Sequence, residues 1–290
     1  MNVSLIVNPS AGNKAYRSIR RIESLLIGRA SLKTFVTGKR GDAFEFAKKS
    51  YDADRIIVSG GDGTFNEVLN GLLSAEDIGR DGVPLALIPT GTTNVLAKEL
   101  QIPEDLEKAA ELALTGTARK ICLGRINGRY FTLMAGIGFD GETVLNVKRS
   151  LRKGSAVKAS HIAAGLNILM KYNPSPIKIR TPERELTGYT VVIGNAKKYG
   201  GHFSITPNAS ITEPLLDVCV YGGRLRTGLL RFIIRAIRGD HLNSDDVSYF
   251  KTPEAEMVSD GDVHIQIDGE YFGTLPARID SVKDAASVVY

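Results

Sequence analysis

Tryptophan is absent from the 290-residue sequence, and cysteine and histidine are scarce, with two and four residues. These few residues show no zinc-ligand spacing, so we expect no zinc site. Cys122 and Cys219 stand in apolar runs, which favours buried free thiols in a reducing cytoplasm over a disulfide. No apolar run reaches about 18 residues, and the apolar stretch after Met1 lacks the basic flank of a signal peptide. We therefore predict a cytoplasmic protein without a membrane-spanning helix.

Acidic residues are missing from two long segments. Residues 143–182 contain eight Lys and Arg but no Asp or Glu, and residues 218–239 contain five Arg and no acid. Such blocks suit an anionic partner, either lipid head groups or nucleic acid. Nucleic-acid grooves use aromatic side chains for stacking, and these blocks hold few, so we favour lipid and expect no nucleic acid.

The second block has the pattern of an amphipathic basic helix. Arg231, Arg235 and Arg238 recur at i, i+4 and i+7, and apolar residues occupy the rest of the turn. A helix of this kind is typical of a membrane interface. An ordinary surface helix that packs its apolar side on the protein would show the same pattern, so both interpretations stay open.

The most informative stretch is Gly60-Gly61-Asp62-Gly63-Thr64, which follows three β-favouring residues and precedes apolar residues at helical spacing. This pattern predicts a buried strand, a glycine turn and a helix. Glycines let the backbone approach a bulky ligand, and the amides at a helix N-terminus suit phosphate. The Asp62 carboxylate would repel phosphate unless a cation lay between them, which indicates Mg²⁺-nucleotide chemistry. The alternative is that Asp62 only caps the helix.

Three more strand-like segments precede turns and helical patterns in the first 120 residues. They are Val3–Val7, Lys33–Val36 and Leu85–Ile88. Strands that alternate with helices predict a parallel sheet covered on both faces, with the loops after the strands converging at one edge. Those loops carry Asn8, Thr37 and Thr92. The helices expected after them are one capped by Asp42, then Val95–Leu100 and Glu104–Leu114.

The pattern changes near residue 120. Two strand-like runs, Ile121–Ile126 and Tyr130–Ala135, flank Asn127-Gly128, which predicts a hairpin with a type I′ turn. An apolar helix over 156–172 and several short strands follow, which predict an antiparallel, β-rich domain. The expected strands are Ile177–Ile179, Tyr189–Ile193, Phe203–Ile205, Leu216–Tyr221 and Val263–Ile267. We expect one domain over 1–122 and a second over 123–276, with 277–290 returning to the first as a strand.

These motifs, in this order, resemble the soluble diacylglycerol kinase family, whose superfamily includes sphingosine and ceramide kinases, and the bacterial branch is the most similar. The glycine turn alone is shared with NAD kinases and phosphofructokinases. The resemblance covers the whole chain and rests on the segments Asn8–Gly12, Thr37 before Gly41-Asp42-Ala43, Gly60–Asn66, Gly91–Asn94, Gly136–Asp140, Gly200-Gly201 with Pro207–Ala209, Leu215–Val218 and Asp268-Gly269-Glu270.

The resemblance implies a three-layer α/β/α nucleotide-binding domain followed by an antiparallel β-sandwich, with the active site between them. It implies Mg²⁺-dependent transfer of the γ-phosphate of ATP to a primary hydroxyl of a lipid at the inner face of the membrane, diacylglycerol above all. A homodimer is a further expectation. The expected ATP-binding residues are Asn8, Pro9, Ser10, Ala11, Gly12, Thr37, Gly60, Gly61, Asp62, Gly63, Thr64, Phe65, Asn66 and Thr92.

Glu270 is the candidate general base, because phosphoryl transfer to a hydroxyl needs a proton acceptor and an Asp-Gly turn can hold a carboxylate in place. The alternative is an ordinary hairpin turn followed by a solvated Glu. Asp62 is the second candidate base, or else part of a carboxylate–water–Mg²⁺ network. Asp140 either joins that network or is a structural cap.

For a structural Mg²⁺, the resemblance points to the Asp217 carboxylate with the backbone carbonyls of Pro214 and Cys219. The chain departs from the family here, because Glu213 and Pro214 replace its usual Asp and Gly. Plain turn capping by Asp217 is the alternative.

Val95 stands where many diacylglycerol kinases have Asp, which leaves a sphingoid base or a monoacylglycerol open as the acceptor. An NAD kinase is a rival that should carry an Asn-Asp or Gly-Thr-Asp segment, and the sequence has neither. A non-catalytic lipid- or nucleotide-binding regulator is the other alternative.

Overall fold

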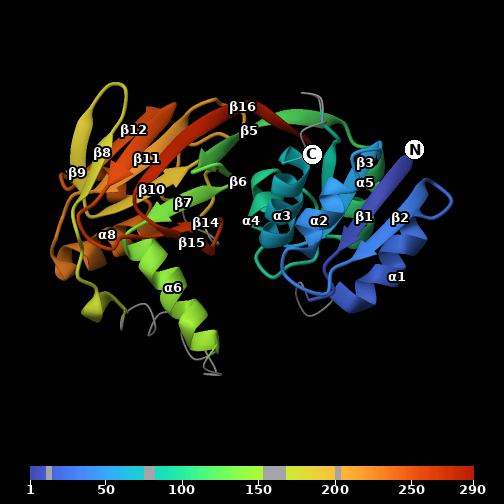
Figure 1. The fold of residues 1–290 in the computed structure, drawn as a ribbon, viewed down its shortest axis with the longest axis horizontal. Helices are drawn as coiled ribbons and strands as arrows, with labels where there is room; N and C mark the ends of the chain where they lie inside the picture. The colour runs from blue at the N-terminus through green and yellow to red at the C-terminus, as the bar shows by residue number, and fades with distance from the viewer. Residues whose placement is uncertain (11–14, 75–81, 153–167, 200–203) are drawn as a thin grey trace. The chain divides into compact units, whose positions relative to one another are not determined.

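The protein is described by a computed structural model that covers residues 1–10, 15–74, 82–152, 168–199 and 204–290. The chain forms two compact units (Figure 1). The first contains Met1–Leu123 and Val282–Tyr290, and the second contains Gly124–Ser281. The chain returns to the first unit within a strand, at Val282 rather than at residue 277. In the ranges that the structure describes, no helix is long and apolar enough to span a membrane.

The first unit is built on a parallel sheet with the strand order β2-β1-β3-β4-β16. Only the last residues of β16 belong to it, and Val288 pairs with Leu85 in parallel. Five consecutive residues of β3, from Ile56 to Gly60, are buried, so both faces of the sheet are covered. The strands are β1 (Asn2–Val7), β2 (Ser31–Val36), β3 (Arg55–Gly60), β4 (Leu85–Pro89) and β16 (Ala277–Val289).

Helices cover this sheet as the alternating pattern predicts. Ile22 of α1 and Ala110 of α5 share one core cluster with aliphatic residues of β1, β3 and β4. Phe46 of α2 stacks on Phe35 of β2, and α3 buries Phe65 and the aliphatic residues that follow at helical spacing. The helices are α1 (Ala15–Leu26), α2 (Asp42–Lys48), α3 (Asp62–Leu73), α4 (Val95–Glu99) and α5 (Leu106–Thr115).

The starts of two helices differ from the prediction. Asp42 does not cap α2; it is the first residue of α2, and Gly41 is the cap. Its Oδ2 atom instead accepts hydrogen bonds from the N–H groups of Gly38 at 2.8 Å and Lys39 at 2.9 Å, so Asp42 fixes the preceding turn. α5 begins at Leu106 rather than at 104, because the carboxylate of Asp105 caps it.

The second unit is a β-sandwich, as predicted. One layer is an antiparallel sheet with the order β12-β11-β10-β7-β14-β15. Its inner residues, such as Ile193 and Val218, share a core cluster with Ile179 and Met257 of the opposite layer. The first layer contains β12 (Val247–Thr252), β11 (Leu216–Tyr221), β10 (Thr190–Gly194), β7 (Met134–Ile137), β14 (His264–Ile267) and β15 (Glu270–Thr274). The other contains β13 (Glu254–Val258), β8 (Ile177–Arg180), β9 (Glu185–Gly188), the start of β16, and β5 (Ala118–Ile126) paired with β6 (Arg129–Phe131).

The predicted hairpin around residue 127 is correct in its turn and wrong in its second strand. Asn127 and Gly128 both have positive φ angles, as a type I′ turn requires. The following run is broken, because β6 ends at Phe131 and β7 begins at Met134 in a different sheet. The backbone N–H groups between them turn to the carboxylate of Asp268 instead of to a neighbouring strand.

The helices of the second unit were predicted in part. α8 (Arg226–Arg238) is the expected basic helix, whereas α6 (Phe139–Arg152) was missed. A short 3-10 helix follows α8 at His241–Asn243. Of the apolar helix expected over 156–172, residues 168–171 are helical and residues 156–167 lie outside the described residues. The first residue of the strand expected at Phe203 also lies outside them, and Ser204 and Ile205 are in no strand.

Candidate active site

The four predicted turns of the first unit meet at the carboxyl edge of its sheet. The N–H of Asn8 donates to the carbonyl of Ser59 at 2.9 Å, and the N–H of Thr37 donates to that of Val7 at 2.9 Å. The N–H of Thr90 donates to the carbonyl of Gly60 at 3.0 Å. The convergence predicted from the sequence is therefore confirmed.

Side chains add further links between these turns. Asn8 Nδ2 donates to Thr64 Oγ1 at 2.9 Å, so the first turn is tied to the start of α3. Asn8 Oδ1 accepts the N–H of Ser10 at 2.9 Å, which closes a local turn. Thr37 is buried and Thr92 is exposed. Ala11 and Gly12, which complete the first motif, lie outside the described residues.

The turns before α3 and α4 touch each other backbone to backbone. A Cβ atom on Gly91 would lie 2.5 Å from the Cα of Gly61, which is closer than real Cβ contacts come. Position 91 therefore requires glycine, because any larger residue would collide with the backbone at Gly61. The first N–H groups of a helix have no acceptor within it, and no side chain caps those of α3. Small residues and unpaired amides together form a surface that suits a phosphate group.

Asp62 connects the two helix starts. Its Oδ2 accepts the N–H of Val95 and its Oδ1 accepts the N–H of Leu96, both at 2.9 Å. Asp62 thus caps α4 and not its own helix, whose cap is Gly61. Each carboxylate oxygen has a second lone pair, so a cation can still bind there. The roles of Asp62 as a base or in a Mg²⁺ network stay predictions.

Asn94 holds the fourth turn in an unusual conformation. Its φ angle is 48°, in the left-handed region that Asn tolerates. Its Nδ2 donates to the carbonyl of Gly91 at 3.0 Å, while its Oδ1 is buried and accepts no hydrogen bond. That oxygen is an acceptor beside the glycine turn that a hydrogen-bond donor of a ligand could satisfy.

In the second unit, the predicted Asp-Gly turn joins β14 to β15. Asp268 and Gly269 have positive φ angles of 46° and 81°, and Ile267 pairs with Glu270 across the turn. The Asp268 carboxylate accepts the Thr132 hydroxyl and the N–H groups of three consecutive residues, at 2.8–3.0 Å. Burial raises the pKa of Asp268, and these donors oppose that shift. The turn is therefore firmly anchored, with half-buried Glu270 directly after it.

A second set of contacts reaches the same turn through Gln266. Its Oε1 accepts the N–H of Gly269 at 2.8 Å, and its Nε2 donates to Asp140 Oδ2 at 2.6 Å. The hydroxyl of Tyr199 donates to Asp140 Oδ1. Burial raises the pKa of Asp140, against the effect of both donors. A Cβ atom on Gly136 would lie 1.8 Å from Asp140 Oδ2, so glycine makes room for this carboxylate.

Asp140 thus orients Gln266 in the described structure, and its part in a Mg²⁺ network stays a prediction. Sequence reasoning missed Gln266 and Tyr199. Gln266 is a buried polar residue two positions before the Asp-Gly turn, and that alternation on a strand is a weak signal.

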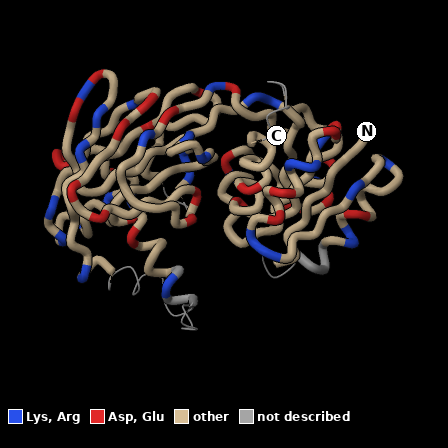
Figure 2. Tube along the Cα trace, in the orientation of Figure 1, with Lys and Arg blue, Asp and Glu red and all other residues tan. Residues whose placement is uncertain are grey.

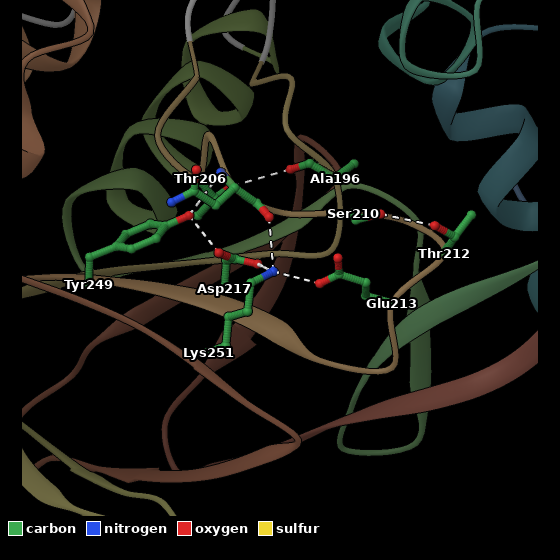
Figure 3. Close-up of polar contacts among 9 residues, drawn as sticks. Ala196, Thr206, Ser210, Thr212, Glu213, Asp217, Tyr249 and Lys251 are labelled. Carbon is green, nitrogen blue, oxygen red and sulfur yellow. Dashed lines mark hydrogen bonds and ion pairs between the residues drawn. The ribbon is translucent and has the colours of Figure 1, made fainter.

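Asp217 is fully buried on β11, and its oxygens already have partners (Figure 3). Oδ1 accepts the hydroxyl of Tyr249 at 2.6 Å, and Oδ2 accepts the ammonium of Lys251 at 2.9 Å. Cys219, an expected carbonyl ligand, lies in the middle of the sheet between Val192 and Tyr249. Because one of these partners is the positively charged Lys251 ammonium, these residues do not fit a divalent cation at Asp217. Across the described parts of the chain, no group of three or more His, Cys, Asp or Glu could hold a metal ion.

Family models match most of the chain. The model of the diacylglycerol kinase catalytic domain matches residues 2–126, and the model of the YegS C-terminal NAD kinase beta sandwich-like domain matches residues 134–290. A diacylglycerol kinase of Bacillus subtilis (strain 168) is 30% identical over 283 residues, 94% of this chain and 91% of the relative. A diacylglycerol kinase of Staphylococcus carnosus (strain TM300) is 27% identical over 290 residues, 98% of this chain and 93% of the relative.

A solved structure shows the same fold. The crystal structure of a diacylglycerol kinase from Bacillus anthracis str. Sterne matches with a TM-score of 0.79 at 25% identity, over 100% of this chain and 96% of that chain. The matched catalytic-domain model and the relatives identify the protein as a lipid kinase. The chain belongs to the diacylglycerol kinase family, as its motifs predict.

Proposed function

We propose that the chain transfers the γ-phosphoryl group of ATP to the primary hydroxyl of diacylglycerol and forms phosphatidic acid. Three findings support this: the family of the chain, the converging turns of the first unit, and the anchored carboxylate after the Asp268-Gly269 turn. The hydroxyl oxygen attacks the γ-phosphorus, the bond to the β-phosphate oxygen breaks, and ADP leaves. The hydroxyl proton passes to Glu270.

The first unit binds ATP in this proposal. The glycine turn and the start of α3 offer backbone N–H groups to the phosphates, and the turns that carry Asn8, Thr37 and Thr92 complete the site. Mg²⁺, when bound, offsets the charge of the phosphates. One protein carboxylate is enough for the Mg²⁺ site, because Mg²⁺ in kinases is held largely by the substrate phosphates and water. Asp62 is that carboxylate.

Glu270 is the general base because it follows a turn that two sets of buried contacts hold in place. A base must lie within hydrogen-bond reach of the hydroxyl that it deprotonates. Asp268 fixes the turn from one side, and Gln266 binds the N–H of Gly269 from the other. Little freedom remains for the residue that comes next, which suits a positioned base.

The acceptor is the least constrained part of the proposal. Val95 gives Asp62 a backbone N–H, and its own side chain is buried, so this position adds no carboxylate for a head group. Diacylglycerol is the first candidate for the phosphoryl acceptor because the relatives are diacylglycerol kinases. A sphingoid base and a monoacylglycerol are the alternative acceptors. Phosphorylation of NAD would instead indicate the rival function, that of an NAD kinase.

The experiment is a transfer assay with purified protein, radiolabelled ATP, Mg²⁺ and mixed micelles of diacylglycerol, monoacylglycerol or sphingosine, with NAD as a separate acceptor. Label in phosphatidic acid that falls about 10²–10⁴-fold in Glu270→Gln supports the proposal. Exposed Glu256→Gln is the matched control and should keep full activity. Label only in NAD, or no loss in Glu270→Gln, would contradict it.

We further propose that the enzyme acts at the cytoplasmic face of the membrane and that α8 contacts the lipid. Large aliphatic side chains stand exposed on and before this helix, while Leu229, Phe232 and Ala236 face inward. No acidic residue occurs in 218–239, and the arginines of α8 can be followed as blue segments in Figure 2. The exposed aliphatic residues are Leu225 (73%), Leu230 (36%), Ile234 (41%) and Ile237 (60%).

Aliphatic residues beside arginines match a surface of anionic lipid, since the former enter the interface and the latter bind phosphate. Flotation with vesicles tests this contact. Protein should bind vesicles that contain phosphatidylglycerol, and Ile234→Ser with Ile237→Ser should abolish the binding. The exposed aliphatic pair Ile27→Ser with Val258→Ser, which lies outside both basic blocks, is the control. Unchanged flotation of the α8 variant would refute the contact. The homodimer stays a prediction for light scattering.

A further inference from the structure

We propose that the ammonium group of Lys251 is a built-in cation that takes the place of a metal ion at Asp217, so that the second unit needs no bound metal there. A carboxylate that is 0% exposed, as that of Asp217 is, requires a cation or several donors to be stable. The structure provides both from neighbouring side chains. This inference is independent of the phosphoryl acceptor.

The register of two strands places the ammonium. Asp217 on β11 lies directly opposite Lys251 on β12, and the same ladder sets Tyr249 two residues before Lys251. Alternate residues of a strand share a face, so Tyr249 and Lys251 reach Asp217 from the same side. Figure 3 shows both side chains pointing at the Asp217 carboxylate. Each takes one of its two oxygens.

The ammonium is fully coordinated by oxygen. Lys251 Nζ lies 2.9 Å from Asp217 Oδ2, 2.8 Å from Glu213 Oε2 and 2.9 Å from the carbonyl oxygen of Asn208. An ammonium has three N–H donors, and each has one acceptor here. Two carboxylates and a backbone carbonyl are also the ligands that a hard divalent cation prefers. The same oxygen set therefore surrounds a tethered cation instead of a free one.

Charge keeps a metal ion out while Lys251 is present. The ammonium lies 2.8 Å from the Glu213 carboxylate and 2.9 Å from that of Asp217, so it already supplies positive charge to both. A metal ion would have to approach the same oxygens to about 2.0–2.6 Å, next to a positive charge. Two cations at that separation repel strongly in a partly buried site.

The cluster fastens the loop before β11 to the sheet. The Tyr249 hydroxyl accepts the N–H of Asn208 at 3.1 Å while it donates to Asp217, and Lys251 holds the carbonyl of the same residue. The loop is thus bound at both the backbone N–H and the backbone carbonyl of Asn208. A bound metal ion would fasten the loop to the sheet in the same way.

Thermal unfolding with and without metal tests the inference. The melting temperature of the wild type should be the same in EDTA, Mg²⁺ and Ca²⁺, measured without ATP. Lys251→Ala leaves two carboxylates and an empty space, so its melting temperature in EDTA should fall by roughly 5–10 °C. Millimolar Ca²⁺ or Mg²⁺ should restore most of that loss. Lys251→Met removes the charge but fills the space. Its melting temperature should therefore stay low in EDTA, Mg²⁺ and Ca²⁺ alike.

Lys251→Met is also the control for metal that binds elsewhere, because it differs from Lys251→Ala only at this site. A folded Lys251→Ala protein that shows no greater response to metal than Lys251→Met would overturn the inference. If neither variant folds, the melting temperature of the wild-type protein provides the test. A rise in its melting temperature with Ca²⁺ or Mg²⁺ that disappears in Asp217→Asn would show a metal ion at Asp217, and the absence of any such rise supports the built-in cation.

Discussion

The two units of the chain form their polar sites in different ways. In the first, the parallel sheet brings the ends of consecutive strands together, and backbone N–H groups, carbonyls and glycines form most of the links. In the second, buried side chains distant in the sequence hold one turn, with Asp268 bound to residues 132–134 and Gln266 to Asp140. A site of the first kind depends mainly on backbone shape, and a site of the second kind depends mainly on individual buried side chains.

Asp268→Ala should produce the largest effect, because it removes the main anchor of the second site. Three backbone N–H groups and the Thr132 hydroxyl lose their acceptor. At about 1–3 kcal/mol for an unsatisfied buried group, the free energy of unfolding should fall by roughly 3–5 kcal/mol. Urea unfolding measures it, with exposed Asp260→Ala as the control. A fall below about 1 kcal/mol would mean that the turn does not depend on this carboxylate.

Gly91→Ala is the corresponding test of the first site. The added methyl group collides with the backbone at Gly61, so the two turns must separate. We expect kcat/KM for ATP to fall by roughly 100-fold, since small displacements of a binding site cost that much. Gly273→Ala, which meets nothing within 4 Å, should keep its activity. Equal activities of the two variants would show that the contact between the turns does not shape the site.

Gln266→Leu tests whether a single buried side chain positions the site of the second unit. Leucine cannot accept the N–H of Gly269, so the turn before Glu270 loosens. We expect kcat to fall roughly 10-fold with little change in KM for ATP, because the proton acceptor is displaced. The same change made in a Glu270→Gln protein should have almost no further effect. An equal loss in both backgrounds would indicate that Gln266 acts independently of Glu270.

Asp42→Asn should have the smallest effect and depends on pH. The N–H groups of Gly38 and Lys39 lower the pKa of Asp42 in the folded protein from 3.8. A lowered folded pKa stabilises the fold above the unfolded pKa, and this contribution disappears as the pH falls through the folded pKa. The wild type should therefore melt slightly above Asp42→Asn at neutral pH, and the difference should shrink below about pH 4. A difference independent of pH would contradict this origin.

Much of the fold could be predicted, and the reason differs between elements. The strands and helices of the first unit follow from periodicity, because parallel strands are continuous apolar runs and the helices are amphipathic. The run after Asn127-Gly128 was misassigned as one strand, since its break depends on Asp268, which lies far away in the sequence. α6 was not predicted, because a glycine-rich motif stands at its start and the helical pattern that follows is largely polar.

The candidate site divides in the same way. Contiguous motifs identified the glycine turn, the converging loops and the position of Glu270 after an Asp-Gly turn. No local pattern indicated that Asp62 caps α4, that Gln266 joins Asp140 to the turn, or that Lys251 neutralises Asp217. A carboxylate in a sequence looks the same whether it will bind a metal, an ammonium or an amide.

The sequence by itself determined the family, the two-part architecture and the candidate residues for the chemistry, because these depend on local propensity and on motifs a few residues long. The tertiary structure decided the partner of each buried carboxylate. That choice depends on which donors the strand register and the helix starts bring within about 3 Å. A sequence lists the donors and acceptors, and only the folded backbone pairs them.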